Sequence, residues 1–358
     1  RAFLLRAGEI EYWITDRDSV VLSGSNIIVG ASELLIAMNR KEAVPRHAAL
    51  VTSGSETQLN PIPAAKLASY ITNWTIGFSV AHHIAETITK LHAILADKMN
   101  RLHETERMLR DISKTYVEII GLLDNESQNR HFPWLFSIVE KAKATGSYNF
   151  GLAFVNKNEE KPIDVSGENM AQYKHVYPTG SIITKEGDKG TDMFILMEGK
   201  IEVRIKNNPI DIIVKKGTVI GEMGLILGTP RTATLRALEN VHVVKIGSRD
   251  MQSIFKNDPD TFFNMISSLA FRENDNCEKI REYTDMVKEV ASGRGERSVS
   301  QVHEYSRELS TLVQELEEQS RMQSGEEWLE QIRDHSRRKA TALLADAGVM
   351  TGNTYVAE

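Results

Sequence analysis

The sequence predicts an α+β chain with two β-rolls of the jelly-roll type, each followed by helices, and long helices of the coiled-coil type. Apolar and polar residues alternate on both sides of a glycine in residues 3–13 and again in residues 194–204, which is typical of β-hairpins. Apolar residues recur at heptad spacing in residues 91–119 and 302–316, which indicates long helices with one apolar seam.

The composition is that of a soluble globular protein. The 358 residues suffice for two domains with accessory helices, and 41% hydrophobic and 26% charged residues are ordinary values. The net charge of −6 argues against a nucleic-acid-binding chain. The one cysteine, Cys277, excludes an internal disulfide and a Cys-cluster zinc site, so we expect a reducing cytoplasm. No apolar run approaches the ~20 residues that a membrane helix needs, so we expect no membrane segment.

The two β-rolls are predicted to be copies of each other. Residues 3–13 (FLLRAGEIEYW) match residues 194–204 (FILMEGKIEVR) at a constant offset of 191, which also carries Gly30 onto Gly221. With six extra residues in the first copy, Arg46 then falls on Arg231. An internal match of this kind indicates a tandem repeat. Because Arg1 lies inside a strand-like run, we also expect residues upstream, and no targeting signal can be judged.

Residues 219–237 (VIGEMGLILGTPRTATLRA) combine three groups that suit a phosphate diester joined to a ribose. N–H groups at the start of a short helix point at an anion, and the guanidinium of Arg231 can pair with it. The carboxylate of Glu222 can accept from a sugar hydroxyl. In this order, the pieces resemble the phosphate-binding cassette of the cyclic nucleotide-binding domain family, to which the catabolite activator protein and the regulatory subunit of the cAMP-dependent kinase belong.

The resemblance implies a role for each residue of the second cassette. Glu222 would accept from the ribose 2′-hydroxyl, Arg231 would pair with the exocyclic phosphate oxygens, and Thr232 would add a hydroxyl contact. The implied ligand-binding residues are Gly221, Glu222, Met223, Gly224, Leu225, Arg231, Thr232, Ala233 and Asn276. The alternative interpretation is an ordinary surface salt bridge of Arg231 and a helix cap by Glu222.

The choice between cAMP and cGMP stays open at this point. The Thr232 hydroxyl can reach the guanine 2-amino group of a syn base, but relatives with Ser or Thr at this position also bind cAMP. Alignment of residues 258–260 with the same turn of the family puts Asn276 where a helix contacts the base, and its amide suits either purine. A solvated helical Asn is the alternative.

The first copy is interpreted as a degenerate site made of Gly30, Ala31 and Arg46. Ala31 stands where the family has Glu, so Arg46 can still attract a phosphate but nothing obvious holds the ribose. Glu33 takes that role only if the turn is rebuilt.

The pattern divides the chain into five parts. We expect a degenerate, N-terminally truncated β-roll, a long helical dimerisation or linker segment, an intact nucleotide-binding domain, a lid or dimer helix, and a helical coiled-coil tail; these span residues 1–62, 63–123, 124–257, 258–291 and 298–358. The apolar heptad seam within residues 63–123 indicates a helix that packs on one side against a bundle or against a second copy of the chain. A dimer is favoured, because the seam of a single helix would otherwise be left exposed.

Other sites are not expected. His82 and His83 are neighbours on a helix, point in different directions and lack a carboxylate at ligand spacing, so no metal site is predicted. No Walker, Gly-x-Ser-x-Gly, kinase or cyclase signature occurs, so no catalytic residue and no cofactor is predicted. Residues 343–358 resemble a helix-turn-helix, but residues 326–358 hold four Arg or Lys against six Asp or Glu, the wrong sign for tracking phosphates.

The resulting hypothesis is a cytoplasmic, non-catalytic sensor of cAMP or cGMP. Ligand binding at the second β-roll would be coupled to homo-oligomerisation through the heptad helices or to an unidentified protein partner. Two alternatives are kept: a structural or scaffolding oligomer with vestigial nucleotide sites, and a DNA-binding regulator that responds to cyclic nucleotides.

Overall fold

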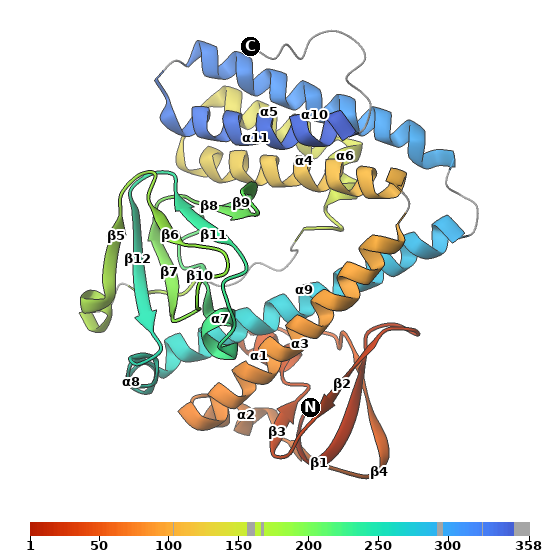
Figure 1. Ribbon diagram of the computed structural model, residues 1–358, viewed down its shortest axis with the longest axis vertical. Helices are drawn as coiled ribbons and strands as arrows, with labels where there is room; N and C mark the ends of the chain where they lie inside the picture. The colour runs from red at the N-terminus through yellow and green to blue at the C-terminus, as the bar shows by residue number, and fades with distance from the viewer. Residues whose placement is uncertain (103, 156–161, 166–167, 292–295, 324, 347–358) are drawn as a thin grey trace. The chain divides into compact units, whose positions relative to one another are not determined.

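The computed structural model describes residues 1–358 except 103, 156–161, 166–167, 292–295, 324 and 347–358. The chain forms two compact units, the first from residues 1–95 and 158–281 and the second from residues 96–157 and 282–358. Helices α3 (Trp74–Arg101) and α9 (Pro259–Ala291) each have residues in both units (Figure 1). Among the described helices, none is long and apolar enough to cross a membrane.

The first unit begins with a four-stranded antiparallel sheet. Its central strand, β1 (Ala2–Trp13), pairs with β2 (Ser19–Ser23), β3 (Ile27–Val29) and β4 (Ala49–Ile62). Within β1, Gly8 has a φ of +95°, and a Cβ there would lie 2.8 Å from the Thr57 backbone of β4. The two strands can therefore approach this closely only with glycine at this point. Helix α1 (Ser32–Arg40) connects β3 to β4, and α2 (Ala64–Ile71) follows β4.

Two four-stranded antiparallel sheets form the second β-structure of this unit. Their strand orders are β10-β7-β12-β5 and β6-β11-β8-β9. The strand bounds are β5 (Lys174–Tyr177), β6 (Ile182–Thr184), β7 (Asp192–Glu198), β8 (Ile201–Ile205), β9 (Asn208–Ile213), β10 (Val219–Ile220), β11 (Thr234–Ala237) and β12 (Val241–Gly247). The short helices are η1 (Glu168–Tyr173), α7 (Glu222–Leu227) and α8 (Met251–Asn257). Apolar residues of both sheets, among them Phe194, Leu196 and Leu235, meet in one core, so the fold is sandwich-like.

Strand pairing in the first sheet recurs in the second β-structure, at the sequence offset of 191 for β1 to β3 and at an offset of 185 for β4, because the first copy has six extra residues before β4. The central strand β1 corresponds to β7 and β8, whereas β4 covers the length that β11 and β12 divide between them. Matching Cα pairs are Phe3–Val29 and Phe194–Ile220, Ile10–Leu22 and Ile201–Ile213, and Trp13–Ala49 and Arg204–Thr234. Sequence similarity and hydrogen-bond register therefore repeat together.

Helices α3 and α9 contribute to one core that also includes residues of both β-structures. Ile84 of α3 and Leu269 of α9 belong to the same buried cluster as Leu35 of α1 and Ile195 of β7. Burial of these apolar side chains is the main favourable term in folding and fixes α9 beside both β-structures of the unit.

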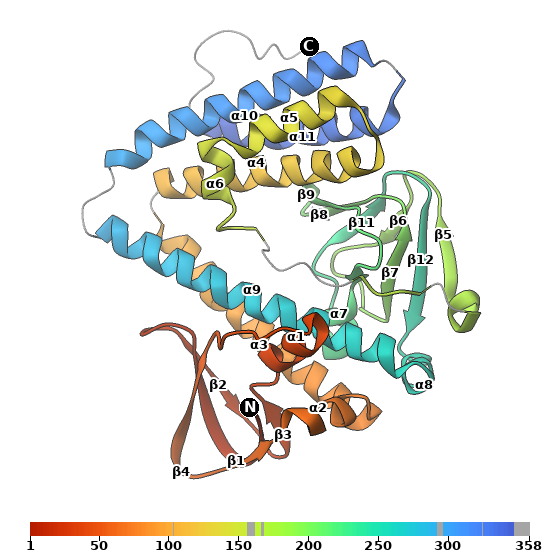
Figure 2. The ribbon, with the colours of Figure 1, turned by 180° about the vertical axis from the view of Figure 1, so that it is seen from behind.

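The second unit is a helical bundle. Its helices are α4 (Glu104–Asn129), α5 (Pro133–Lys143), α6 (Gly146–Gly151), α10 (Glu296–Met322) and α11 (Glu327–Asp346), and Figure 2 shows α4, α10 and α11 running side by side. Leu109, Ile112 and Tyr116 of α4 are buried in one cluster with Leu309 and Leu312 of α10. The apolar heptad positions of α4 and α10 therefore pack in one core within the chain, whereas Leu91 and Leu95 of the first segment lie on α3.

The structure differs from the predicted division of residues 63–123 and 124–257. The first range contains α2, α3 and most of α4, and α4 continues through the predicted boundary to Asn129. The polar residues after Leu123 stay helical because Ser127 donates to the Asp124 carbonyl and Glu126 pairs with Arg130 at 2.7 Å. Because α10 covers the part of the seam that lies on α4, this part has a partner within the chain and gives no support to the expected dimer.

Of the two C-terminal divisions, residues 258–291 contain α9, and residues 298–358 contain α11 and all but the first two residues of α10. Most of the helix-turn-helix-like stretch lies outside the described residues.

Candidate functional site

The predicted cassette of the second β-structure is built around Gly221. This residue links β10 to α7 with a φ of +78°, and a Cβ there would lie 2.4 Å from Nη1 of Arg231. Glycine is thus needed both for the left-handed backbone and for the close approach of the guanidinium. Gly228 ends α7 with a φ of +66°, and the chain then reaches Arg231.

Arg231 is buried within the cassette rather than exposed on the surface. The residue is 8% exposed; Nη1 donates to the Gly221 carbonyl at 2.8 Å and Nη2 to the Asp192 carbonyl at 2.5 Å. Burial lowers the pKa of the guanidinium, while the nearby charges of Asp192 and Glu222 act in the opposite direction. The interpretation of Arg231 as an ordinary surface salt bridge is therefore wrong. A buried cation whose hydrogen bonds go to neutral carbonyls favours the approach of an anion.

Glu222 is buried next to Gly221 and meets a charge from α9. It is 1% exposed, and its Oε1 forms an ion pair with Nη2 of Arg272 at 2.6 Å. Gly221 occupies the N-cap position of α7 and no side chain caps it, so the interpretation of Glu222 as the helix cap is also wrong. Arg272 was not among the predicted site residues, although it lies one helical turn before Asn276 on the same helix.

The other predicted ligand-binding residues differ in how far they are exposed. Gly224 and Leu225 are buried, and the Leu225 N–H donates to the Gly221 carbonyl at 3.4 Å as a helical hydrogen bond. Met223 and Ala233 are half-buried and Thr232 is exposed. Asn276 is 7% exposed on α9. The structure thus brings Gly221, Glu222 and Arg231 together.

The first cassette has the same guanidinium contacts but a different acid. Arg46 donates to the carbonyls of Gly30 and Arg1, which correspond to Gly221 and Asp192 at the offset of 191. Its Nη1 also lies 3.1 Å from Oε2 of Glu33, a carboxylate that is 4% exposed.

Ala31, at the position of the family's Glu, is buried and offers no carboxylate. The other Glu33 oxygen accepts from the backbone N–H of His47 at 3.2 Å, so both oxygens of this carboxylate contact residues of the first cassette. A cavity of about 790 Å³ opens beside Arg46 and is lined in part by Trp13, His47 and Arg281. The sequence places Glu33 two residues after Ala31, but it does not show that the Glu33 carboxylate contacts Arg46.

Comparison with known proteins identifies the second β-structure. Residues 174–258 match the family model of the cyclic nucleotide-binding domain. These residues form a cyclic nucleotide-binding domain.

Three relatives show how far the similarity extends. The chain is 32% identical over 85 residues to a cyclic nucleotide-gated potassium channel of Rhizobium etli, covering 24% of this chain and 23% of that protein. It is 33% identical over 98 residues to a cGMP-dependent protein kinase of Eimeria tenella, covering 27% and 10%. It is 26% identical over 187 residues to the cAMP-dependent protein kinase regulatory subunit of Schizosaccharomyces pombe, covering 50% and 40%. The chain thus spans less than half the length of each of these relatives.

Proposed function

We propose that this protein is a non-catalytic, cytoplasmic sensor that binds cAMP or cGMP at the cassette of residues 221–233. The observation that carries the proposal is the convergence of buried Glu222 and buried Arg231 on Gly221 within the cyclic nucleotide-binding domain. The named relatives, a nucleotide-gated channel, a cGMP-dependent kinase and a kinase regulatory subunit, support a regulatory role.

In the proposed complex, the exocyclic phosphate oxygens pair with the Arg231 guanidinium, whose present contacts are neutral carbonyls. The ribose 2′-hydroxyl donates to Glu222, where it competes with Arg272 for the carboxylate. Thr232, which is exposed, and Asn276 on α9 contribute the remaining contacts to the nucleotide. Because Arg272 belongs to α9, ligand binding changes a contact of that helix and shifts its equilibrium between arrangements.

We further propose that the first sheet is a degenerate copy of the same domain. The shared register and the matching contacts of Arg46 and Arg231 support common descent of the two cassettes. Ala31 removes the ribose acceptor, and Glu33 already neutralises Arg46. Nucleotide binding is therefore assigned to the second cassette.

The output of the sensor is proposed to be a change at its helices, either homo-oligomerisation or binding of a protein partner. Since the heptad residues of α4 and α10 cover one another, the contacting surface lies on other faces of these helices. Sedimentation analysis with and without nucleotide tests this step; an unchanged oligomeric state leaves partner binding as the output.

Calorimetry with cAMP and cGMP on the full chain tests the binding site. Arg231→Ala should weaken binding by about 10- to 100-fold, since a hydrogen bond to a charged group contributes about 1.5–3 kcal/mol. Arg46→Ala, the matched change in the first cassette, should leave affinity unchanged. Absence of binding heat for the wild type at high micromolar nucleotide would refute the sensor and favour the scaffold. The DNA-binding alternative requires a nucleotide-dependent, salt-sensitive gel shift.

A further inference from the structure

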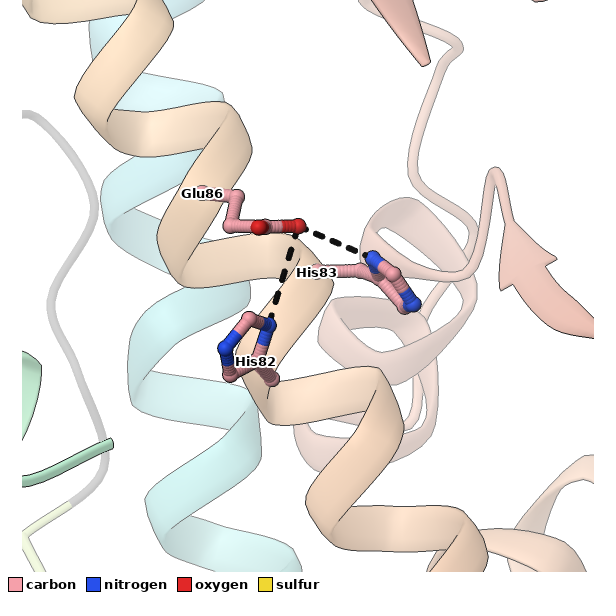
Figure 3. Close-up of side chains that lie close together, drawn as sticks. All are labelled: His82, His83 and Glu86. Atoms are coloured by element: carbon pink, nitrogen blue, oxygen red, sulfur yellow. Dashed lines mark hydrogen bonds and ion pairs between the residues drawn. The ribbon is translucent and has the colours of Figure 1, made fainter. Parts of the chain in front are cut away.

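Three side chains of metal-ligating type lie close together on helix α3, and two of them line a cavity beside the first cassette. They are His82, His83 and Glu86, and Figure 3 shows the Glu86 carboxylate turned toward both imidazole rings. Although neighbouring residues on a helix point about 100° apart, Glu86 lies three and four residues later and so reaches both. The expectation that these histidines lack a carboxylate at ligand spacing is wrong, because it overlooked Glu86.

The spacing of the ligand atoms suits one small cation. Oε2 of Glu86 lies 3.1 Å from Nδ1 of His83 and 3.6 Å from Nδ1 of His82. One ligand atom from each of the three residues lies within 4.8 Å of the other two. Four ligands at 2.0–2.1 Å from a tetrahedral zinc ion are about 3.4 Å apart, so two of the three separations already match.

The surroundings supply room for further ligands. His83 and Glu86 line a cavity of about 30 Å³ together with Gly30, Ala31 and Ser32 of the first cassette. That volume holds one or two waters, which can complete a coordination shell.

We propose that His82, His83 and Glu86 form a binding site for a divalent transition-metal ion, with Zn²⁺ as the best match and water as the fourth ligand. Two imidazoles and one carboxylate suit Zn²⁺, whereas Mg²⁺ and Ca²⁺ require mainly oxygen ligands. The site lies beside the first cassette, whereas the nucleotide is assigned to the second.

Calorimetric titration of the untagged full chain with Zn²⁺ tests the proposal. The wild type should bind one Zn²⁺ ion per chain. His83→Ala and Glu86→Gln should each lower the Zn²⁺ affinity at least about tenfold, because loss even of an outer-shell partner lowers metal affinity by about 10–100-fold. His175→Ala, which removes an exposed histidine from β5, should bind like the wild type. Mg²⁺ should give no saturable heat. Visible absorption of the Co²⁺-loaded chain should report a tetrahedral site that Glu86→Gln weakens.

Two results would overturn the proposal. The first is Zn²⁺ binding by the wild type that is absent or without defined stoichiometry. The second is equal affinity in wild type, His83→Ala and Glu86→Gln, provided that circular dichroism shows the variants folded. Glu86→Gln keeps the size of the side chain and its reach toward the histidines, so it separates the loss of a ligand from a loss of structure.

Discussion

Replacement of Glu273 by Gln should stabilise the first unit at alkaline pH and change it little in acid. Glu273 lies on α9, is 5% exposed, and accepts a 2.7 Å hydrogen bond from the Ser32 hydroxyl. Burial raises the pKa of Glu273 from its ordinary 4.5 to about 7, and the charge of Glu33 adds to the rise, whereas hydrogen bonds from Ser32 and Tyr12 oppose it. Cys277, also buried, lies next to Tyr12 in the same cluster.

The direction of the effect follows from proton binding. Below about pH 4.5, Glu273 is protonated in both the folded and unfolded chain and contributes no pH dependence. Between that value and about 7, folding takes up a proton, so the free energy of unfolding falls as the pH rises. Above this range the folded chain holds a buried carboxylate, at a cost of roughly 3 kcal/mol as an upper limit from ~1.4 kcal/mol per pKa unit. Glu273→Gln leaves no titrating group at this position, so the variant does not lose this stability as the pH rises.

Urea unfolding near pH 5 and pH 8, followed by the fluorescence of Trp13 and Trp74 in variants that lack the tryptophans of the second unit, measures the effect. The gain in unfolding free energy of Glu273→Gln over wild type should increase between the two pH values. Glu42→Gln, at an exposed residue beyond α1, serves as the control and should show no such increase. An equal gain at both pH values, or a loss at pH 8, would contradict the reasoning.

Glycine substitutions give the remaining predictions. Gly221→Ala should lower nucleotide affinity at least about tenfold in calorimetry, because its Cβ would lie 2.4 Å from Nη1 of Arg231 and displace the guanidinium; unchanged affinity would show that Arg231 does not bind the phosphate. Gly77→Ala should destabilise the first unit by about 1–3 kcal/mol in urea unfolding, because its Cβ would lie 2.1 Å from the Ile71 carbonyl. Gly121→Ala is the matched helical change with no atom within 4 Å, and it should stabilise the bundle by about 0.5–1 kcal/mol. Equal effects of the two helical substitutions would rule out the steric explanation.

The cassette could be predicted from the sequence because its requirements are local. Gly221, Glu222 and Arg231 lie within eleven consecutive residues, and the positive φ of the turn at Gly221 is a conformation that glycine adopts readily. The repeated strands were also predictable, since alternation of apolar residues and glycine corners repeats with the register. Local patterns of this kind depend little on what the rest of the chain does.

The partners of these residues could not be predicted, because they come from distant parts of the chain. Arg272 reaches Glu222 from α9, and α10 covers a seam of α4 that has no visible partner in its own segment. Periodicity shows that a helix has an apolar face but not which helix covers it. Glu86 is different, because its spacing to His82 and His83 was readable and was overlooked.

Helix α9 connects the two cassettes through adjacent residues. Arg272 pairs with Glu222 of the second cassette, and Glu273 accepts from Ser32, which follows Ala31 in the first. Because consecutive helical residues point about 100° apart, one rigid helix presents these two contacts to different neighbours. In the proposed complex, a nucleotide that displaces Arg272 from Glu222 would act on a helix whose next residue, Glu273, is held by a buried hydrogen bond from Ser32. If α9 moves when the proposed sensor binds nucleotide, the hydrogen bond between Ser32 and Glu273 would hold the helix at this point.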